Sequence, residues 1–122
     1  MKLAGCYTAL ITPFRNGQVD FDALGVIVEQ QIAGGVAGLV PVGTTGESPT
    51  LTYREHDDVI KFVTEKANKR CQIIAGTGGN STFEAIHLSK NAAEFGADFR
   101  TADRRRTSNR HGLPDRLPDG LR

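Results

Sequence analysis

The sequence has no tryptophan, one methionine and only two cysteines in 122 residues. Cys6 and Cys71 are too few for a disulfide framework and have no histidine at a metal-ligand spacing, so no metal site is expected. No apolar run approaches the roughly 20 residues that span a bilayer, so no membrane partner is expected. Thr8, Thr12 and Pro13 interrupt the N-terminal apolar stretch, which argues against a secretory signal and predicts a cytoplasmic protein.

Basic charge is scarce in most of the chain and concentrated in its last part. Residues 1–99 hold 8 basic and 11 acidic side chains, whereas residues 100–122 hold 7 basic and 3 acidic ones. Only four apolar side chains occur in residues 100–122, too few to offset chain ordering, so a disordered, arginine-rich tail is predicted. A nucleic-acid-binding arm is the alternative, but three aspartates dilute the charge and no aromatic side chain is present for base stacking. No nucleic-acid partner is therefore expected.

Short apolar runs alternate with amphipathic segments along residues 1–99, which predicts alternating strands and helices. Helices are predicted after the capping residues Asp20, Thr52 and Ser81. Strands are predicted at residues 5–12, 38–42 and 72–75, with the start of a fourth at 97–99. This order predicts an α/β fold of parallel strands covered by helices, and both a doubly wound sheet and part of a (β/α)₈ barrel fit it. The chain is too short for a complete barrel, which needs about 250 residues.

Two loops rich in glycine and hydroxyl groups follow predicted strands, at Gly43–Ser48 and Gly76–Asn80. In either architecture, ligands bind at such loops, and their backbone N–H and threonine hydroxyl groups suit a carboxylate or phosphate. Neither loop is a Walker A or Gly-x-Gly-x-x-Gly motif. Anion binding and tight-turn geometry remain equally open for the first loop, and the second slightly favours turns.

A histidine and a glutamate occupy the first turns of the two helices that follow these loops. His56 shares the inward stripe of Val59 and Ile60, which favours a buried structural histidine over a ligand-binding one. For Glu84, closing the capping box that Ser81 begins is at least as good an interpretation as ligand binding.

The order of motifs matches a known family. The strand ending Thr12-Pro13-Phe14 is followed by the loop GTTGESPTL (43–51), Glu55, the segment AGTGGNST–EAI–L (75–88) and GAD (96–98). Together they closely resemble the dihydrodipicolinate synthase (4-hydroxy-tetrahydrodipicolinate synthase) family, within the superfamily that includes N-acetylneuraminate lyase. The resemblance covers residues 1–99.

The resemblance implies the first three to three and a half units of a TIM barrel, left incomplete. It implies a homotetrameric enzyme that condenses pyruvate with L-aspartate-4-semialdehyde in lysine biosynthesis, through a lysine Schiff base and without a metal or organic cofactor. Thr45 matches the residue that holds the pyruvate carboxylate, between Gly43 and Gly46 of the same loop, and Thr44 matches a proton-relay threonine. The positions that bind feedback lysine in regulated members are matched by Ser48, His56, Asn80 and Glu84.

Several parts of that machinery have no counterpart here. None of the five lysines is predicted at the end of a strand, where the Schiff-base lysine belongs, and neither Tyr7 nor Tyr53 matches a relay tyrosine. Tyr53 also stands where some regulated members have histidine. After Phe99 the sequence turns to RTADRRR, which indicates a shifted reading frame or a truncated gene. The chain alone is therefore predicted to be inactive. The alternatives are another pyruvate-dependent aldolase or lyase, or a small non-enzymatic anion-binding α/β module.

Overall fold

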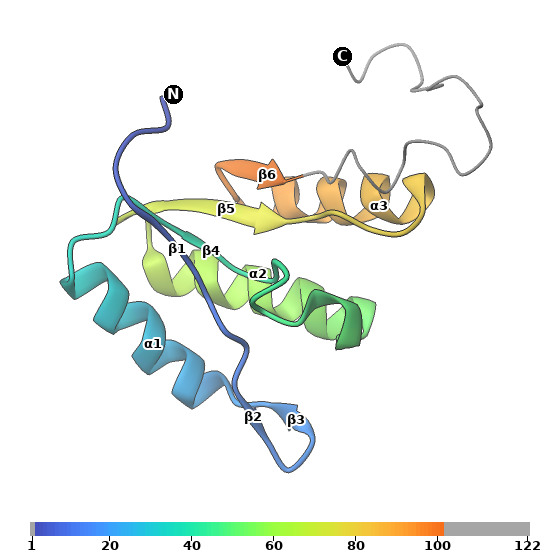
Figure 1. The fold of residues 1–122 in the computed structure, drawn as a ribbon, viewed down its shortest axis with the longest axis horizontal. Coiled ribbons are helices and arrows are strands. Elements are labelled where there is room, and N and C mark those ends of the chain that lie inside the picture. Colours follow the sequence, from blue (N-terminus) through green and yellow to red (C-terminus); the bar gives the residue numbers. More distant parts are fainter. Residues whose placement is uncertain (1, 102–122) are drawn as a thin grey trace.

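The computed structural model describes residues 2–101, and the tail predicted at 102–122 lies outside them. Four parallel strands form one sheet in the order β1-β4-β5-β6 (Figure 1). The strands are β1 (Tyr7–Ala9), β4 (Gly38–Val40), β5 (Gln72–Gly76) and β6 (Phe99–Thr101), and the helices are α1 (Phe21–Ala33), α2 (Tyr53–Ala67) and α3 (Thr82–Glu94). The alternating parallel units predicted from the sequence are confirmed. None of the helices within residues 2–101 is long and apolar enough to cross a membrane.

Each helix begins at its predicted capping residue. The Asp20 carboxylate accepts a hydrogen bond from the Ala23 amide at 3.0 Å. Thr52 and Glu55 form a complete capping box, in which each side chain binds the other residue's backbone N–H group. The Ser81 hydroxyl accepts from the Glu84 amide at 3.1 Å. These bonds satisfy N–H groups that have no partner within the helix, so the caps fix where each helix starts.

The helix ends depend on residues that adopt positive φ. Gly35 and Gly96, with φ of 81° and 86°, follow α1 and α3 and allow the left-handed turn that ends each helix. The second helix ends at Ala67, because Asn68 adopts the left-handed conformation at φ 46°. Asparagine tolerates this conformation better than most residues, which makes it a helix terminator.

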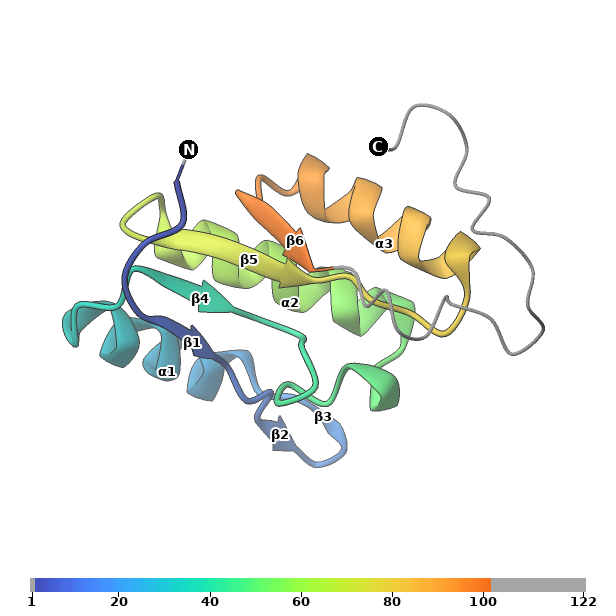
Figure 2. The same cartoon turned by 45° about the horizontal axis from the view of Figure 1, so that its top comes forward.

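The hydrophobic core lies between the sheet and the helices, which all pack on one face (Figure 2). The strands contribute Leu39, Ile73 and Ala75. The helices contribute Leu24 and Val28 from α1, Val59, Ile60, Val63 and Ala67 from α2, and Ala92 from α3. Successive strand residues point to opposite faces, so Val40 and Ile74 point away from this core.

A small hairpin that the sequence analysis missed connects the first strand to α1. Strands β2 (Phe14–Arg15) and β3 (Gln18–Val19) pair antiparallel. Asn16 and Gly17 form the two-residue turn between them, both at positive φ. Asn-Gly is the strongest short hairpin signal, and it was overlooked because two-residue strands carry almost no apolar pattern.

The last described strand extends past the predicted boundary at residue 99. Arg100 and Thr101 pair with Ala75 and Gly76 of β5, so these two residues belong to the sheet and not to a tail. The Thr101 carbonyl accepts from the Thr77 amide at 3.1 Å, and the Arg100 guanidinium donates to the Ser89 carbonyl at 3.0 Å. Composition gives no sign of this pairing, because it reports side chains and not backbone hydrogen bonds.

Of the glycines in the described residues, Gly76 has the least room for a side chain. Its amide donates to the Pro41 carbonyl at 3.0 Å. A Cβ at this position would lie 2.3 Å from the Val42 carbonyl oxygen, which is backbone and has little freedom to move. At Gly43, in the neighbouring loop, the nearest atom to an added Cβ is 4.0 Å away.

We predict that Gly76→Ala lowers the free energy of unfolding by about 3 kcal/mol, the upper range for overpacking. Gly43→Ala is the matched control and should change it by less than about 0.5 kcal/mol. Urea denaturation followed by circular dichroism measures both free energies. Equal effects of the two substitutions would contradict the close backbone contact at Gly76.

Candidate functional site

The two glycine-rich loops lie at the same end of the sheet. Residues 43–48 follow β4 and residues 76–80 follow β5. These strands are parallel neighbours, so their carboxyl ends meet at one edge of the sheet. The hydrogen bond from Gly76 to Pro41 ties the start of the second loop to the end of β4. The sequence predicted this juxtaposition, which is where parallel α/β folds bind ligands.

The first loop is held closed by its own backbone and by a residue of the preceding unit. The Gly46 amide donates to the Gly43 carbonyl at 3.0 Å, and the buried Thr12 hydroxyl donates to the Gly46 carbonyl at 2.7 Å. A Cβ at Gly46 would lie 3.0 Å from the Leu10 carbonyl oxygen. Gly46 therefore permits a close backbone approach, and Thr12 fixes the loop against the segment that follows β1.

Two threonines in this loop present unused polar groups to solvent. Thr44 and Thr45 are exposed, and neither hydroxyl has a hydrogen-bond partner within residues 2–101. Their amides also donate to no backbone carbonyl in that part of the chain. A row of preorganised donors at a strand end suits a small carboxylate, and a hydroxyl can both donate and accept a proton.

Backbone strain marks both ends of the loop. Val42 has φ of 49° and Glu47 has φ of 58°. Positive φ is costly for a β-branched residue, and such strain persists only where the surroundings enforce it. Val42 is buried in the core and contacts Gly76, so packing holds the loop in this conformation.

His56 is a buried residue of α2, with 3% of its surface exposed. Its Nε2 lies 2.8 Å from the Gly76 carbonyl oxygen, which can only accept, so Nε2 carries the proton. Nδ1 has no partner in the described chain and lies 3.8 Å from Asp57 Oδ1, which is also unpartnered there. Burial holds the pKa of His56 below its usual value, although the Gly76 carbonyl and Asp57 oppose that shift. The expected structural histidine is therefore a neutral, buried one that ties α2 to the second loop.

Glu84 does not complete the second capping box as Glu55 completes the first. Its carboxylate accepts a hydrogen bond from the Tyr53 hydroxyl at 2.5 Å, which joins the first turns of α2 and α3. That bond lowers the pKa of Glu84, with smaller contributions from the backbone of Ser81 and Asn80. The same contact raises the pKa of Tyr53. The sequence predicted the position of Glu84 in its helix but missed its partner, since the contact spans 31 residues.

Of the four residues matched to the feedback-lysine positions, Asn80 and His56 lie near Glu84. Glu84 lies against Gly79, where an added Cβ would be 2.9 Å from Oε2, and interacts with Asn80 and His56. Ser48 instead begins the short helix η1 (Ser48–Thr50), and its amide donates to the Gly43 carbonyl at 3.3 Å. Sequence reasoning also missed Thr77, which is fully buried and bonded to Ser89 and Thr101.

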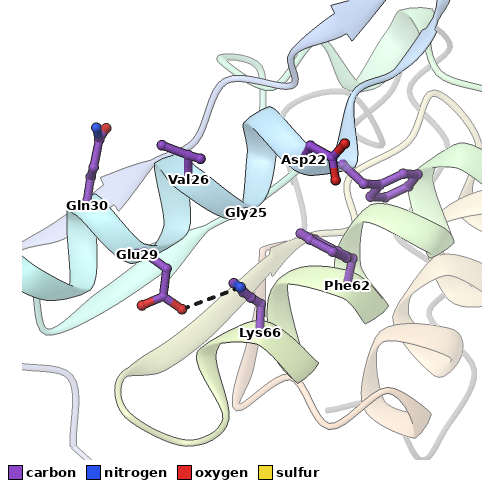
Figure 3. A pocket seen from close by; sticks show the side chains of 8 residues that line it. Asp22, Gly25, Val26, Glu29, Gln30, Phe62 and Lys66 are labelled. Carbon is purple, nitrogen blue, oxygen red and sulfur yellow. Dashed lines mark ion pairs between the residues drawn. The ribbon is translucent and has the colours of Figure 1, made fainter.

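A shallow groove of about 430 Å³ lies between α1 and α2, on the helical side of the molecule (Figure 3). Phe21 and Phe62 line it, and Glu29 forms an ion pair with Lys66 across it. Neither glycine-rich loop contributes a residue to this groove. It is therefore separate from the carboxyl edge of the sheet, where the candidate site lies.

The chain has five lysines, and none lies in a strand. Lys61, Lys66 and Lys90 lie in helices, and Lys69 follows the end of α2 with φ of 60°. Lys2 precedes β1. No lysine therefore reaches the carboxyl edge of the sheet from a strand end.

The family model described as the dihydrodipicolinate synthetase family matches residues 2–102. The 4-hydroxy-tetrahydrodipicolinate synthase of Geobacter metallireducens is 58% identical over 94 residues, which is 77% of this chain and 32% of that enzyme. The crystal structure of dihydrodipicolinate synthase from Aquifex aeolicus superposes with a TM-score of 0.80 at 49% identity, covering 82% of this chain and 34% of that one.

A chloride-inhibited dihydrodipicolinate synthase from Acinetobacter baumannii, complexed with pyruvate, superposes with a TM-score of 0.78 at 48% identity. The match covers 80% of this chain and 34% of that one. The chain thus spans about a third of the length of the relatives it matches.

The geometry at His56 predicts a pH-dependent stability. The unfolded chain takes up a proton near the ordinary pKa of 6.5, whereas the native protein does so only at lower pH. The contribution of His56 to the free energy of unfolding is therefore fully present above pH 6.5, and it decreases as the pH drops below that value.

We predict that His56→Gln, which keeps a donor for the Gly76 carbonyl, reduces the stability loss between about pH 7.5 and about pH 5.5. His87→Gln, at an exposed position of α3, is the control and should leave that loss unchanged. Urea denaturation at both pH values measures the difference. An unchanged slope in the His56 variant would show that another group is responsible.

Proposed function

Because this chain belongs to the dihydrodipicolinate synthetase family, we propose that residues 1–99 are the pyruvate-binding N-terminal part of a 4-hydroxy-tetrahydrodipicolinate synthase. In this proposal they form the first three to three and a half units of a (β/α)₈ barrel. One observation carries the proposal: at the carboxyl end of β4, a family loop presents two exposed threonines whose hydroxyls have no partner among residues 2–101.

Thr45 is proposed to hold the pyruvate carboxylate through its hydroxyl and amide, with Gly43 and Gly46 shaping the loop around it. Thr44 is proposed to pass a proton through its hydroxyl, which can donate and accept in turn. The hydrogen bond from Thr12 to Gly46 supports both roles, because a preorganised donor costs little reorganisation when charge develops on the substrate.

The whole reaction needs groups that the described residues lack. The condensation of pyruvate with L-aspartate-4-semialdehyde proceeds in this family through a lysine Schiff base, and no lysine of this chain stands at a strand end. We therefore propose that the chain alone does not catalyse it. The homotetramer of the family and a cytoplasmic location belong to the same proposal.

A feedback site for lysine is proposed around Ser48, His56, Asn80 and Glu84. The ionised Glu84 carboxylate would attract an ammonium group, and the His56 ring has an unpartnered Nδ1 acceptor within the described residues. Tyr53 already donates to Glu84, so an incoming ammonium group would compete with that hydroxyl.

The carboxylate role is tested in a chimera in which residues 2–99 of this chain replace the matching part of the Geobacter metallireducens enzyme. Thr45→Val should raise the KM for pyruvate about tenfold or more, because a hydrogen bond to a charged group contributes about 1.5–3 kcal/mol. Thr44→Val should lower kcat by about a hundredfold or more.

Thr50→Val is the control, because its exposed hydroxyl donates to the Glu47 carbonyl at 2.9 Å and has no proposed role in the site. Steady-state kinetics with pyruvate as the varied substrate measures all three variants. An inactive chimera that folds, or unchanged kinetics in both threonine variants, would contradict the proposal.

The proposal that this chain alone forms no Schiff base with pyruvate is tested on the chain itself. Treatment of residues 1–122 with pyruvate and borohydride should leave the intact mass unchanged, whereas a full-length family enzyme should gain the reduced pyruvate adduct. A lysine adduct on this chain would show that it forms the Schiff base after all.

A further inference from the structure

One face of the parallel sheet is uncovered within the described residues. The three helices all pack against the face that carries Leu39 and Ile73. The register places Ala9, Val40, Ile74 and Phe99 on the opposite face. Ile11 follows the buried Leu10, points the other way and is 55% exposed. We call these five residues the open face. All five are apolar. The same register also places Tyr7, Gln72 and Thr101 on this face, where the Tyr7 hydroxyl donates to Gln72 Oε1, so the face is mixed but carries no charged strand residue. Parallel sheets are normally covered on both faces.

Both edges of this sheet are also open within residues 2–101. Cys6 and Leu10 direct backbone groups to β4, so the alternate residues Tyr7 and Ala9 direct theirs to the outer edge of β1. At the other edge, the Thr101 carbonyl is bonded to Thr77, so the backbone groups of Arg100 point outward. Each edge therefore offers donors and acceptors for a further parallel strand.

The structure assigns these surfaces to one occupant: we propose that a second copy of this chain pairs with them and closes an eight-stranded barrel. β6 of each copy would lie parallel to β1 of the other. A two-fold rotation about the barrel axis makes both seams at once, because β1 and β6 are the opposite edges of a single sheet. Two sheets of four strands give eight, the number at which side chains just fill a closed barrel.

The charges at the seam fit this pairing. Edge strands that avoid pairing usually carry lysine, inward-pointing charge or proline. Residues 5–12, which include the edge strand β1, contain none of these. The one charged side chain of β6, Arg100, donates to the Ser89 carbonyl of α3, so it points toward the helices and away from the open face. The incoming β1 therefore meets no like charge and no blocking residue.

The area is sufficient for a weak but specific pair. Four strands of three to five residues, about 4.8 Å apart, cover roughly 220 Å² of projected sheet in each copy. Side chains expose more area than this projection, and two backbone seams add to it. The closed pair then buries on the order of 1,000 Å², near the lower bound of specific interfaces. The two copies would also bring two Thr44–Thr45 loops to the same rim, since all eight strands run in one direction.

The test is the mass of the full 122-residue chain in solution, measured by sedimentation equilibrium between about 1 and about 100 µM, where interfaces of this size can dissociate. A two-chain mass is expected. Ile11→Glu should raise the dissociation constant at least tenfold, because it places a charge on the open face. Val26→Glu is the matched control and should leave the constant unchanged, since Val26 is 57% exposed and lines the groove between α1 and α2, on the helical side of the sheet.

Hydrogen exchange keeps the proposal testable if Ile11→Glu fails to fold. In the unaltered chain, exchange at the Ala9 amide should slow as the two-chain species forms, because that amide enters the new seam. A monomer at the highest concentration would overturn the proposal, and so would open oligomers larger than two chains. An Ala9 amide protected equally at every concentration would also overturn it, because residues 102–122 of the same chain would then cover the edge.

Discussion

The arrangement of the candidate site depends on the close contact between Gly76 and the end of β4. The Gly76 amide binds the Pro41 carbonyl, its carbonyl binds His56, and its missing side chain leaves room for the Val42 carbonyl. One residue thus connects two loops and a helix. If the strand ends moved apart, Val42 would lose the contact that holds it at positive φ, and the threonines after it would lose their orientation.

This contact explains why the site needs few charged groups. Within the described residues, the loop of Thr44 and Thr45 offers hydroxyl and amide donors and contains no cationic side chain. An anion held by neutral donors can be released more easily than one held by an ion pair, which suits a substrate that must react and leave. The cationic part of the proposed chemistry would come from the Schiff-base lysine, which this chain does not provide at a strand end.

The sequence predicted the local features and missed the contacts between distant residues. Thr52, Ser81, Gly35 and Gly96 mark helix limits because capping depends on residues a few positions away. The bond from Tyr53 to Glu84 and the bond from Thr12 to Gly46 each cross more than 30 positions, so no local pattern contains them. The positive φ of Val42 was equally hidden, because the packing that enforces it comes from β5. Periodicity left a doubly wound sheet and part of a (β/α)₈ barrel open. The order of the motifs was more informative, because it indicated the family.

The strand order has a consequence for how the chain folds. Each strand pairs with the next parallel strand along the sequence, as Tyr7 with Gly38, Gly38 with Gln72, and Ile74 with Phe99. Every pairing therefore closes a loop of similar, moderate length, and the entropic cost of closure changes little from one unit to the next. No strand has to wait for a distant partner. A nascent chain can add one strand and one helix at a time as it leaves the ribosome, so assembly of this sheet follows the direction of synthesis.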